Sequence, residues 1–164
     1  SSGDFLMFLD DDDYLFGDHI EMNVQAIDDA DFAYTYAWDL KTDIIDMQKA
    51  EYREEGFEFS QYFTRDHSVE RLKYENFIPI QSALFRRGLY EQHGGFDTRL
   101  DMLEDWNLWL RFSQTGTFKV VPKITSAYRT PANEKKHQER RRLFDASYSE
   151  VYEINEQYWL SRTQ

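Results

Sequence analysis

The chain has 164 residues, no cysteine and a formal net charge of −12, from 31 acidic against 19 basic side chains. This charge argues against a nucleic-acid backbone or an anionic lipid surface as the main partner, because both need a basic face. The absence of cysteine excludes disulfides and thiolate metal sites and fits a reducing, cytoplasmic compartment, and no apolar run approaches the roughly 20 residues that span a bilayer.

The first elements in chain order are predicted to be a strand, a helix and a second strand. The continuous apolar run in residues 4–10 indicates a strand that is buried on both faces of a sheet. A helix is expected over residues 18–27, with Asp18 as its N-cap. Three apolar residues define the face that it would bury: Ile20, Val24 and Ile27. The second strand is expected over residues 31–40, with 43–48 pairing back on it.

The middle of the chain is less regular. Residues 50–74 are charged and aromatic, and we expect one or two short helices joined by loop. A strand is predicted over 77–87, followed by a short helix over 88–96 that Gly94 and Gly95 close at its C-terminus. Three later elements are expected: a helix over 103–116, a strand over 118–129 broken by Pro122, and a helix over 133–164.

Strands that alternate with helices predict an α/β sandwich with a mixed sheet flanked by helices. Pro131 marks the candidate boundary, which divides the chain into a domain over 1–131 and a C-terminal helical extension over 132–164. The first strand has the pattern of an interior strand, although it begins close to the first residue. We therefore expect its missing neighbours to come from sequence that precedes Ser1.

Four consecutive aspartates, Asp10 to Asp13, follow the first strand. Ligands of open α/β sheets bind at the carboxyl ends of strands, and clustered carboxylates repel one another unless a hard divalent cation joins them. A solvated acidic loop is the alternative explanation. An EF-hand is excluded, because Tyr14 and Leu15 stand where that loop needs an oxygen ligand and a glycine.

Two blocks of the sequence resemble family 2 glycosyltransferases of the GT-A fold. The stretch FLDDDD, residues 8–13, is similar to the Asp-x-Asp motif that ends a strand in this family. Residues 80–116 resemble the family's later block, with a GFD sequence, an ED pair that opens a helix, and a closing glycine, and 120–129 resembles the strand that follows. The resemblance covers roughly residues 3–130. It implies the second half of a GT-A sandwich, with the N-terminal nucleotide-binding half absent.

The resemblance also implies a reaction, in which a sugar moves from a nucleotide-diphospho-sugar donor to the hydroxyl of a carbohydrate or other acceptor. Asp10 and Asp12 would bind a divalent metal, Mn²⁺ or Mg²⁺, which stabilises the charge on the leaving diphosphate. Asp11 would face the ribose or sugar of the donor. Asp13 is placed on the same donor side, where it would also cap the next turn. The displacement would be a single step that inverts the anomeric centre.

The base that the ED motif implies is Asp105, with Glu104 as the second choice. Both acids could instead only stabilise the positive helix N-terminus, by roughly 0.3–1 kcal/mol each. On the acceptor side, the expected residues are Asp97 and Trp109. A turn-forming role for Asp97 and core packing for Trp109 are the alternatives.

Two other functions remain open from the residues themselves. A metal-dependent nucleotidyltransferase would use Asp10 and Asp12 but would leave Glu104 and Asp105 without a catalytic role. A non-catalytic binding or interaction module would keep the acidic run only as surface. The basic run at residues 139–142 is expected to be a solvated helix face, with weak docking to the anionic inner face of a membrane as the alternative.

Overall fold

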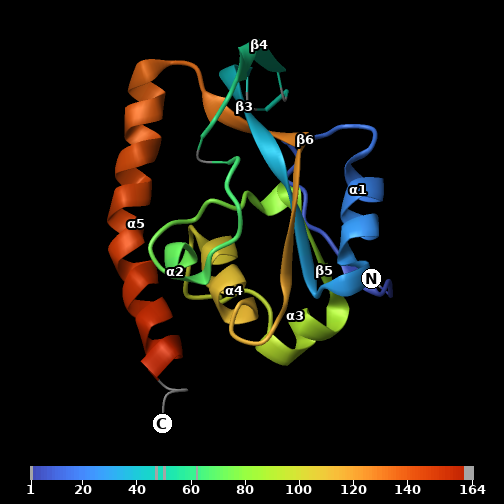
Figure 1. Cartoon of the computed structure of the whole chain (residues 1–164). Coiled ribbons are helices and arrows are strands. Elements are labelled where there is room, and N and C mark those ends of the chain that lie inside the picture. The colour runs from blue at the N-terminus through green and yellow to red at the C-terminus, as the bar shows by residue number, and fades with distance from the viewer. Residues whose placement is uncertain (1, 47, 50, 62, 161–164) are drawn as a thin grey trace.

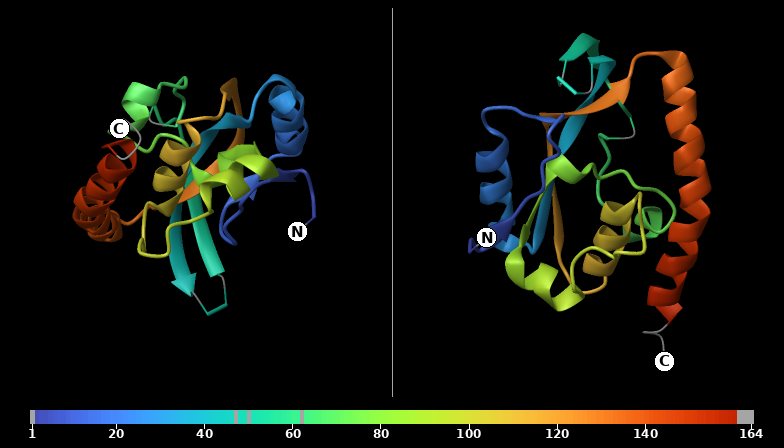
Figure 2. Two further views of the ribbon diagram at one scale, coloured as in Figure 1. Left: turned by 90° about the horizontal axis from the view of Figure 1, so that it is seen from below. Right: turned by 180° about the vertical axis from the view of Figure 1, so that it is seen from behind.

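The computed structural model describes residues 2–46, 48–49, 51–61 and 63–160. Within them, helices flank both faces of a mixed sheet (Figures 1 and 2), as the predicted α/β class requires. The strands are β1 (Phe5–Leu6), β2 (Tyr14–Leu15), β3 (Phe32–Asp46), β4 (Glu51–Glu58), β5 (Ala83–Arg86) and β6 (Phe118–Pro131). The helices are α1 (His19–Ala26), α2 (Val69–Leu72), α3 (Arg87–His93), α4 (Glu104–Phe112) and α5 (Glu134–Leu160), with 3-10 turns η1 (Ile27–Asp29) and η2 (Ile80–Ser82). The predicted segments 43–48, 50–74 and 133–164 each contain positions outside the described residues, namely 47, 50, 62 and 161–164.

The strand order is β1-β5-β3-β6-β2, and β4 pairs with β3 beyond this path. β3 and β6 are parallel, whereas the other pairs are antiparallel. Since β1 and β3 are both antiparallel to β5, β1 runs parallel to β3. The acidic run therefore follows the carboxyl end of a strand in this sheet, as the sequence predicts.

The long strand β6 contains the predicted interruption at Pro122. The β3–β6 register shifts between Thr35 and Tyr36 of β3, opposite Pro122 and Lys123. Proline has no backbone N–H to give to a ladder, so it is tolerated at such a bulge. The interruption is confirmed, but as a bulge within one continuous strand.

The predicted pairing of 43–48 with 31–40 is wrong. β3 runs straight through Lys41 and Thr42, and its outer half pairs with β4 instead (Figure 1). The Lys-Thr pair lacks the glycine or asparagine that a two-residue hairpin turn favours. Helices at the start of 50–74 are wrong too, because β4 is a strand; its exposure along almost its whole length explains why no apolar period marked it. Helix α2 is the one described helix that fits this prediction.

The first strand is also different from the prediction. β1 has two residues and, within the described part of the chain, pairs with β5 alone. The apolar residues 5–8 are half-buried rather than buried on both faces. Among the described residues β1 is thus an edge strand, and the neighbour expected from sequence that precedes Ser1 stays a prediction.

Helix α1 turns a different face to the sheet from the predicted one. Ile20 and Val24 are 60% and 41% exposed, whereas Ile27, just past the helix, is 1% exposed. The buried residues of the helix are His19, Asn23 and Ala26. His19 Nδ1 lies 2.6 Å from Thr125 Oγ1, so polar partners on β6 decide which face packs inward.

The helix ends follow recognisable local chemistry. Gly94, at the end of α3, has a φ of 78°, and Gly95 a φ of 73°, which confirms the predicted C-cap. Asp18 stands at the N-cap position of α1 but makes no side-chain cap bond, because its carboxylate pairs with Lys123. Leu103, before α4, has a φ of 60° in the left-handed region, which is strained for a residue other than glycine.

The main core lies between the sheet and helices α4 and α5 (Figure 2). Its aromatic members include Phe32, Tyr34, Phe85, Trp106, Trp109 and Phe112. The helix predicted from residue 133 onward is observed as α5, and its Val151 and Ile154 enter the same core. Among the described residues, no helix combines the length and the apolar character that crossing a bilayer requires.

The orientation of α1 can be tested with two substitutions in the 164-residue chain. Ile20→Lys should change the free energy of unfolding by less than about 0.5 kcal/mol, because the side chain is in solvent. Ile27→Ala should cost about 2–4 kcal/mol by leaving a cavity. Urea unfolding followed by circular dichroism measures both. Equal losses for the two variants would mean that the helix buries the predicted face after all.

Candidate active site

The acidic loop, residues 10–13, forms a tight turn in which the Asp13 N–H donates to the Asp10 carbonyl at 3.2 Å. Asp10, Asp12 and Asp13 each offer a carboxylate oxygen, and these atoms lie within 4.8 Å of one another. Asp13 Oδ2 is buried and has no hydrogen-bond partner in the described part of the chain. Three oxygen donors, one of them unsatisfied, suit a hard divalent cation such as Mn²⁺ or Mg²⁺.

Arg129 of β6 holds the acidic loop in place. Its backbone N–H donates to Asp13 Oδ1 at 3.0 Å, and its guanidinium donates to the Asp12 carbonyl. The same guanidinium, 7% exposed, bonds to Glu54 Oε1 at 2.8 Å and to Tyr14 Oη at 2.6 Å. Arg129 therefore serves as an ion-pair partner of Glu54. The pairing joins the loop to three strands.

Burial and neighbouring charges raise the affinity for protons of two carboxylates of the loop, Asp10 and Asp13. Burial raises the pKa of Asp13 to about 7, and the neighbouring Asp12 and Asp10 add to this effect. Burial likewise raises the pKa of Asp10, followed by the charges of Asp12 and Asp11. A bound divalent cation would remove this repulsion, which is a further reason why the loop fits a metal.

Asp105 lies in the first turn of α4 and lines the same cavity as Asp10 of the acidic loop. Its Oδ1 accepts from the Trp106 N–H at 2.7 Å, and both of its oxygens lie 3.0 Å from Asn76 Nδ2. Burial raises the pKa of Asp105 to about 7, and the charges of Glu104 and Asp10 raise it further, although the donors Asn76 and Trp106 oppose the shift. Such a carboxylate is half ionised near neutral pH, which suits a general base.

A cavity of about 750 Å³ connects the acidic loop, the start of α4 and the first turns of α5. Of the site residues predicted from the sequence, Asp10, Glu104 and Asp105 line it. Its other charged lining residues are Asp101, His137, Arg140, Arg141 and Asp145, and its apolar walls include Phe63, Ile80, Met102, Phe144 and Tyr148. The fold thus brings together acids that are far apart in the chain.

Arg140 and Asn76 line the cavity although the sequence singled out neither of them. The stretch 139–142 is mostly exposed, as expected, but Arg140 is half-buried and lines the cavity. Its guanidinium donates to Tyr128 Oη and lies over the Phe144 ring, 5.5 Å from the centroid. The positive charge lowers the pKa of Asp10, the opposite of what burial does. In sequence Arg140 is one of three adjacent arginines, and no local signal separates it from the others.

The two residues expected on the acceptor side are placed elsewhere. Trp109 is fully buried, and its Nε1 donates to the Ile78 carbonyl at 3.1 Å, so neither ring face is open to a sugar. In this structure Trp109 therefore packs in the core, the position that the alternative expects, and does not line the cavity. Asp97 does not line the cavity; its carboxylate pairs with Arg99 and accepts from Tyr158, and the Arg99 bond holds its pKa at about 2.

The remaining predicted residues lie on the acidic loop. Asp11 is exposed, which is compatible with a place on the donor side. Asp13 is 8% exposed and faces the backbone of Arg129, so it cannot reach a donor in this structure. The expected donor contact of Asp13 is thus replaced by a buried position within the metal-capable cluster.

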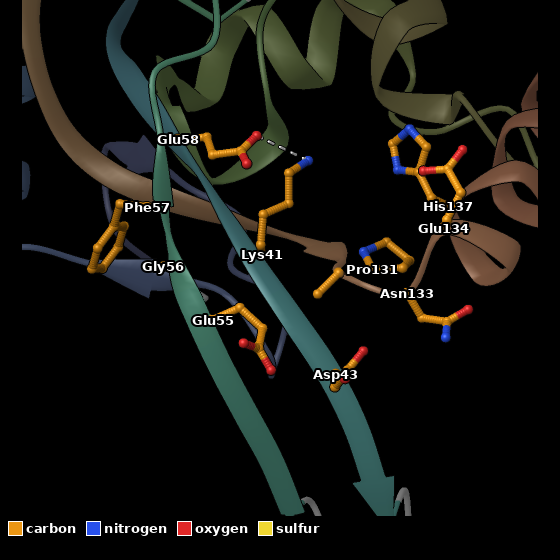
Figure 3. Close-up of a pocket in the computed structure, with 11 residues that line it drawn as sticks. Lys41, Asp43, Glu55, Gly56, Phe57, Glu58, Pro131, Asn133, Glu134 and His137 are labelled. Atoms are coloured by element: carbon orange, nitrogen blue, oxygen red, sulfur yellow. Dashed lines mark ion pairs between the residues drawn. The ribbon is translucent and has the colours of Figure 1, made fainter.

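A second hollow, of about 740 Å³, lies between the β3–β4 hairpin and the start of α5 (Figure 3). On its hairpin side, Lys41 of β3 points toward Glu58 of β4, 3.7 Å away. Its other acidic lining residues are Asp43, Glu55 and Glu134. None of the site residues predicted from the sequence lines this hollow, so the cavity beside Asp10 and Asp105 is the better candidate.

The chain is similar to known proteins in sequence and in fold. No protein-family model matches the chain. The chain is 28% identical over 131 residues to YwdF of Bacillus subtilis (strain 168), an uncharacterized glycosyltransferase; the match covers 78% of this chain and 46% of YwdF.

The fold is similar to part of a solved structure, that of S. aureus TarS 1-349. The complex of TarS with UDP-GlcNAc superposes with a TM-score of 0.59 at 16% identity, over 82% of this chain and 37% of TarS. The complex with UDP gives 0.58 at 16% identity, over 79% and 37%. The chain therefore spans less than half the length of these relatives, and it shares its mixed α/β fold with part of TarS.

The raised pKa of Asp13 predicts a gain in stability from Asp13→Asn in the metal-free chain. The folded-state pKa of about 7 lies above the ordinary value of 3.8, so ionising Asp13 costs folding free energy once the pH exceeds about 4. The gain should grow from pH 4 to pH 7, remain constant above, and reach between about 1 and 4 kcal/mol.

Thermal and urea unfolding in the presence of a chelator measure this gain. The introduced amide would keep an acceptor for the Arg129 N–H, so that contact is preserved. Asp28→Asn, at an exposed aspartate, is the control and should change the free energy of unfolding by less than about 0.5 kcal/mol. A variant at position 13 that is less stable than the parent at pH 8 would contradict the assignment of a buried, repelled carboxylate.

Proposed function

We propose that this chain forms the metal-binding and acceptor side of a glycosyltransferase of family 2, with the GT-A fold. The observation that carries the proposal is the single cavity on which Asp10 of the metal-capable cluster and Asp105 of α4 converge. A metal-dependent nucleotidyltransferase would explain the metal-capable cluster but would leave Asp105 without a role. A purely structural module would explain neither the unsatisfied Asp13 oxygen nor the cavity.

The donor would be a nucleotide-diphospho-sugar, and TarS, whose structures hold UDP and UDP-GlcNAc, suggests a uridine nucleotide. Asp10 and Asp12 would hold Mn²⁺ or Mg²⁺, with Asp13 beneath them. When bound, the metal supplies positive charge to the leaving diphosphate. Arg140, on the opposite wall, adds a second positive charge close to Asp10.

The acceptor would be a carbohydrate or another hydroxyl compound that enters beside α4. Asp105 would take the proton of the acceptor hydroxyl while the oxygen of that hydroxyl bonds to the anomeric carbon. The bond from that carbon to the diphosphate oxygen breaks, and its electron pair leaves with the diphosphate. Attack from the face opposite the leaving group inverts the anomeric centre, and Glu104 is the reserve candidate for the base.

The metal assignment is tested by replacing Asp12 with alanine in the full-length protein. Loss of a ligand should weaken Mn²⁺-dependent donor binding by about 100-fold or more, since even changes behind the ligands cost 10- to 100-fold. Calorimetry with UDP-sugars, with and without Mn²⁺, measures the effect. Asp28→Ala is the matched control and should bind donor normally. Unchanged binding in the Asp12 variant would exclude this residue as a ligand.

The base assignment is tested by Asp105→Asn. The variant should bind donor as the parent does but transfer sugar about 10²- to 10⁴-fold more slowly, because the proton acceptor is gone. In the parent, transfer should fall as the pH drops through about 7, where Asp105 becomes protonated. Asp101→Asn removes a charge from the same cavity and should keep most of the rate. Normal transfer by Asp105→Asn would exclude it as the base.

A further inference from the structure

Asn76 lies in the loop between α2 and η2, and its amide is directed at Asp105. Its Nδ2 is 3.0 Å from each carboxylate oxygen. Two tryptophans of α4 fix the loop on either side of this contact, because Trp106 Nε1 donates to the Leu72 carbonyl at 2.6 Å and Trp109 Nε1 to the Ile78 carbonyl at 3.1 Å. The position of Asn76 is thus set by the same helix that carries Asp105.

The two oxygens of Asp105 are not equivalent. Oδ1 accepts from Asn76 and also from the Trp106 N–H at 2.7 Å. Within the described part of the chain, Oδ2 accepts from Asn76 alone, so it keeps a lone pair for an incoming proton. On this geometry, which rests on the proposed function, we infer that Oδ2 of Asp105 accepts the proton and that Asn76 is the positioning residue that holds it toward the acceptor.

The orientation of the amide supports this role. Asn76 turns its amide nitrogen to the carboxylate, while its Oδ1 is buried without a hydrogen-bond partner in the described residues. The reverse orientation would place two oxygens against each other and repel an ionised Asp105. The amide therefore leaves its own carbonyl unsatisfied, and in doing so it stabilises the charged form of the base.

This stabilisation works against the other groups around Asp105. Glu104 on the same helix and Asp10 of the acidic loop disfavour its negative charge, whereas the Trp106 N–H favours it. Tyr128 of β6 lines the same cavity and interacts electrostatically with Asp105. The remaining charged or titratable groups of the cavity are Asp101 before α4 and His137, Arg140, Arg141, Asp145 and Tyr148 on α5. Asn76 is the one side-chain amide within hydrogen-bond reach of Asp105 in the described residues.

Asn76→Leu, in the full-length protein, removes the donor at similar volume. The pKa of Asp105, followed by carboxyl-carbon NMR without metal, should rise by about one pH unit or more, because a hydrogen bond to a charged group is lost. The acidic limb of the pH profile of kcat should move to higher pH by the same amount as the pKa of Asp105. At pH 7 transfer should fall about fivefold or more, because roughly a tenth of Asp105 would be ionised instead of half. It should recover largely at pH 8.5, with Mn²⁺-dependent binding of UDP-sugar within twofold of the parent.

Asn76→Asp is the second variant, nearly isosteric and without a donor, and it should move the limb further because it adds a like charge. An unmoved limb and an unmoved Asp105 pKa, with transfer lost equally at every pH, would show a merely structural role and overturn the inference. That result differs from a failure of the proposed function, in which Asp105→Asn itself transfers sugar normally.

Discussion

The buried guanidinium of Arg129 is the contact on which the candidate site depends. It bonds to the Asp12 carbonyl, Glu54, Tyr14 and Thr42, while its own backbone N–H bonds to Asp13. An arginine charge so deeply placed is stable only when fully paired. The pairing ties the acidic loop to β6, and three of its four aspartates, Asp10, Asp12 and Asp13, are held close enough to share a cation.

A second constraint acts from the opposite wall. The indole N–H groups of Trp106 and Trp109 bind α4 to the loop that carries Asn76, so the first turn of the helix has little freedom. Asp105 therefore faces the cavity from a rigid element, with Asp10 across from it. The two acids differ in their support: Asp10 has two aspartate neighbours and Arg140 nearby, whereas Asp105 has an amide and a backbone N–H. The environment of Asp10 suits the binding of a cation, whereas that of Asp105 suits the uptake of a proton.

Much of the fold could be predicted where the local pattern and the tertiary environment agree. The glycine pair closing α3, the break at Pro122 and the long helix α5 each depend on backbone chemistry that is local. The predictions failed where residues far apart in the chain determine which face of a helix is buried or which segments pair as strands. The face of α1 follows the bond from His19 to Thr125 rather than its apolar stripe, and β4 is an exposed strand whose pairing with β3 leaves no apolar period.

The sequence by itself determined which chemistry was available: four acids at the carboxyl end of a strand, and an acid pair at the start of a helix. Only the tertiary structure decided which of these acids meet. It buried Asp13 and Trp109, moved Asp97 away from the cavity, and recruited Asn76 and Arg140, which carry no local signal. The physical reason is that burial, pKa and hydrogen bonding of a side chain depend on groups brought near it by packing, and these lie far away along the chain.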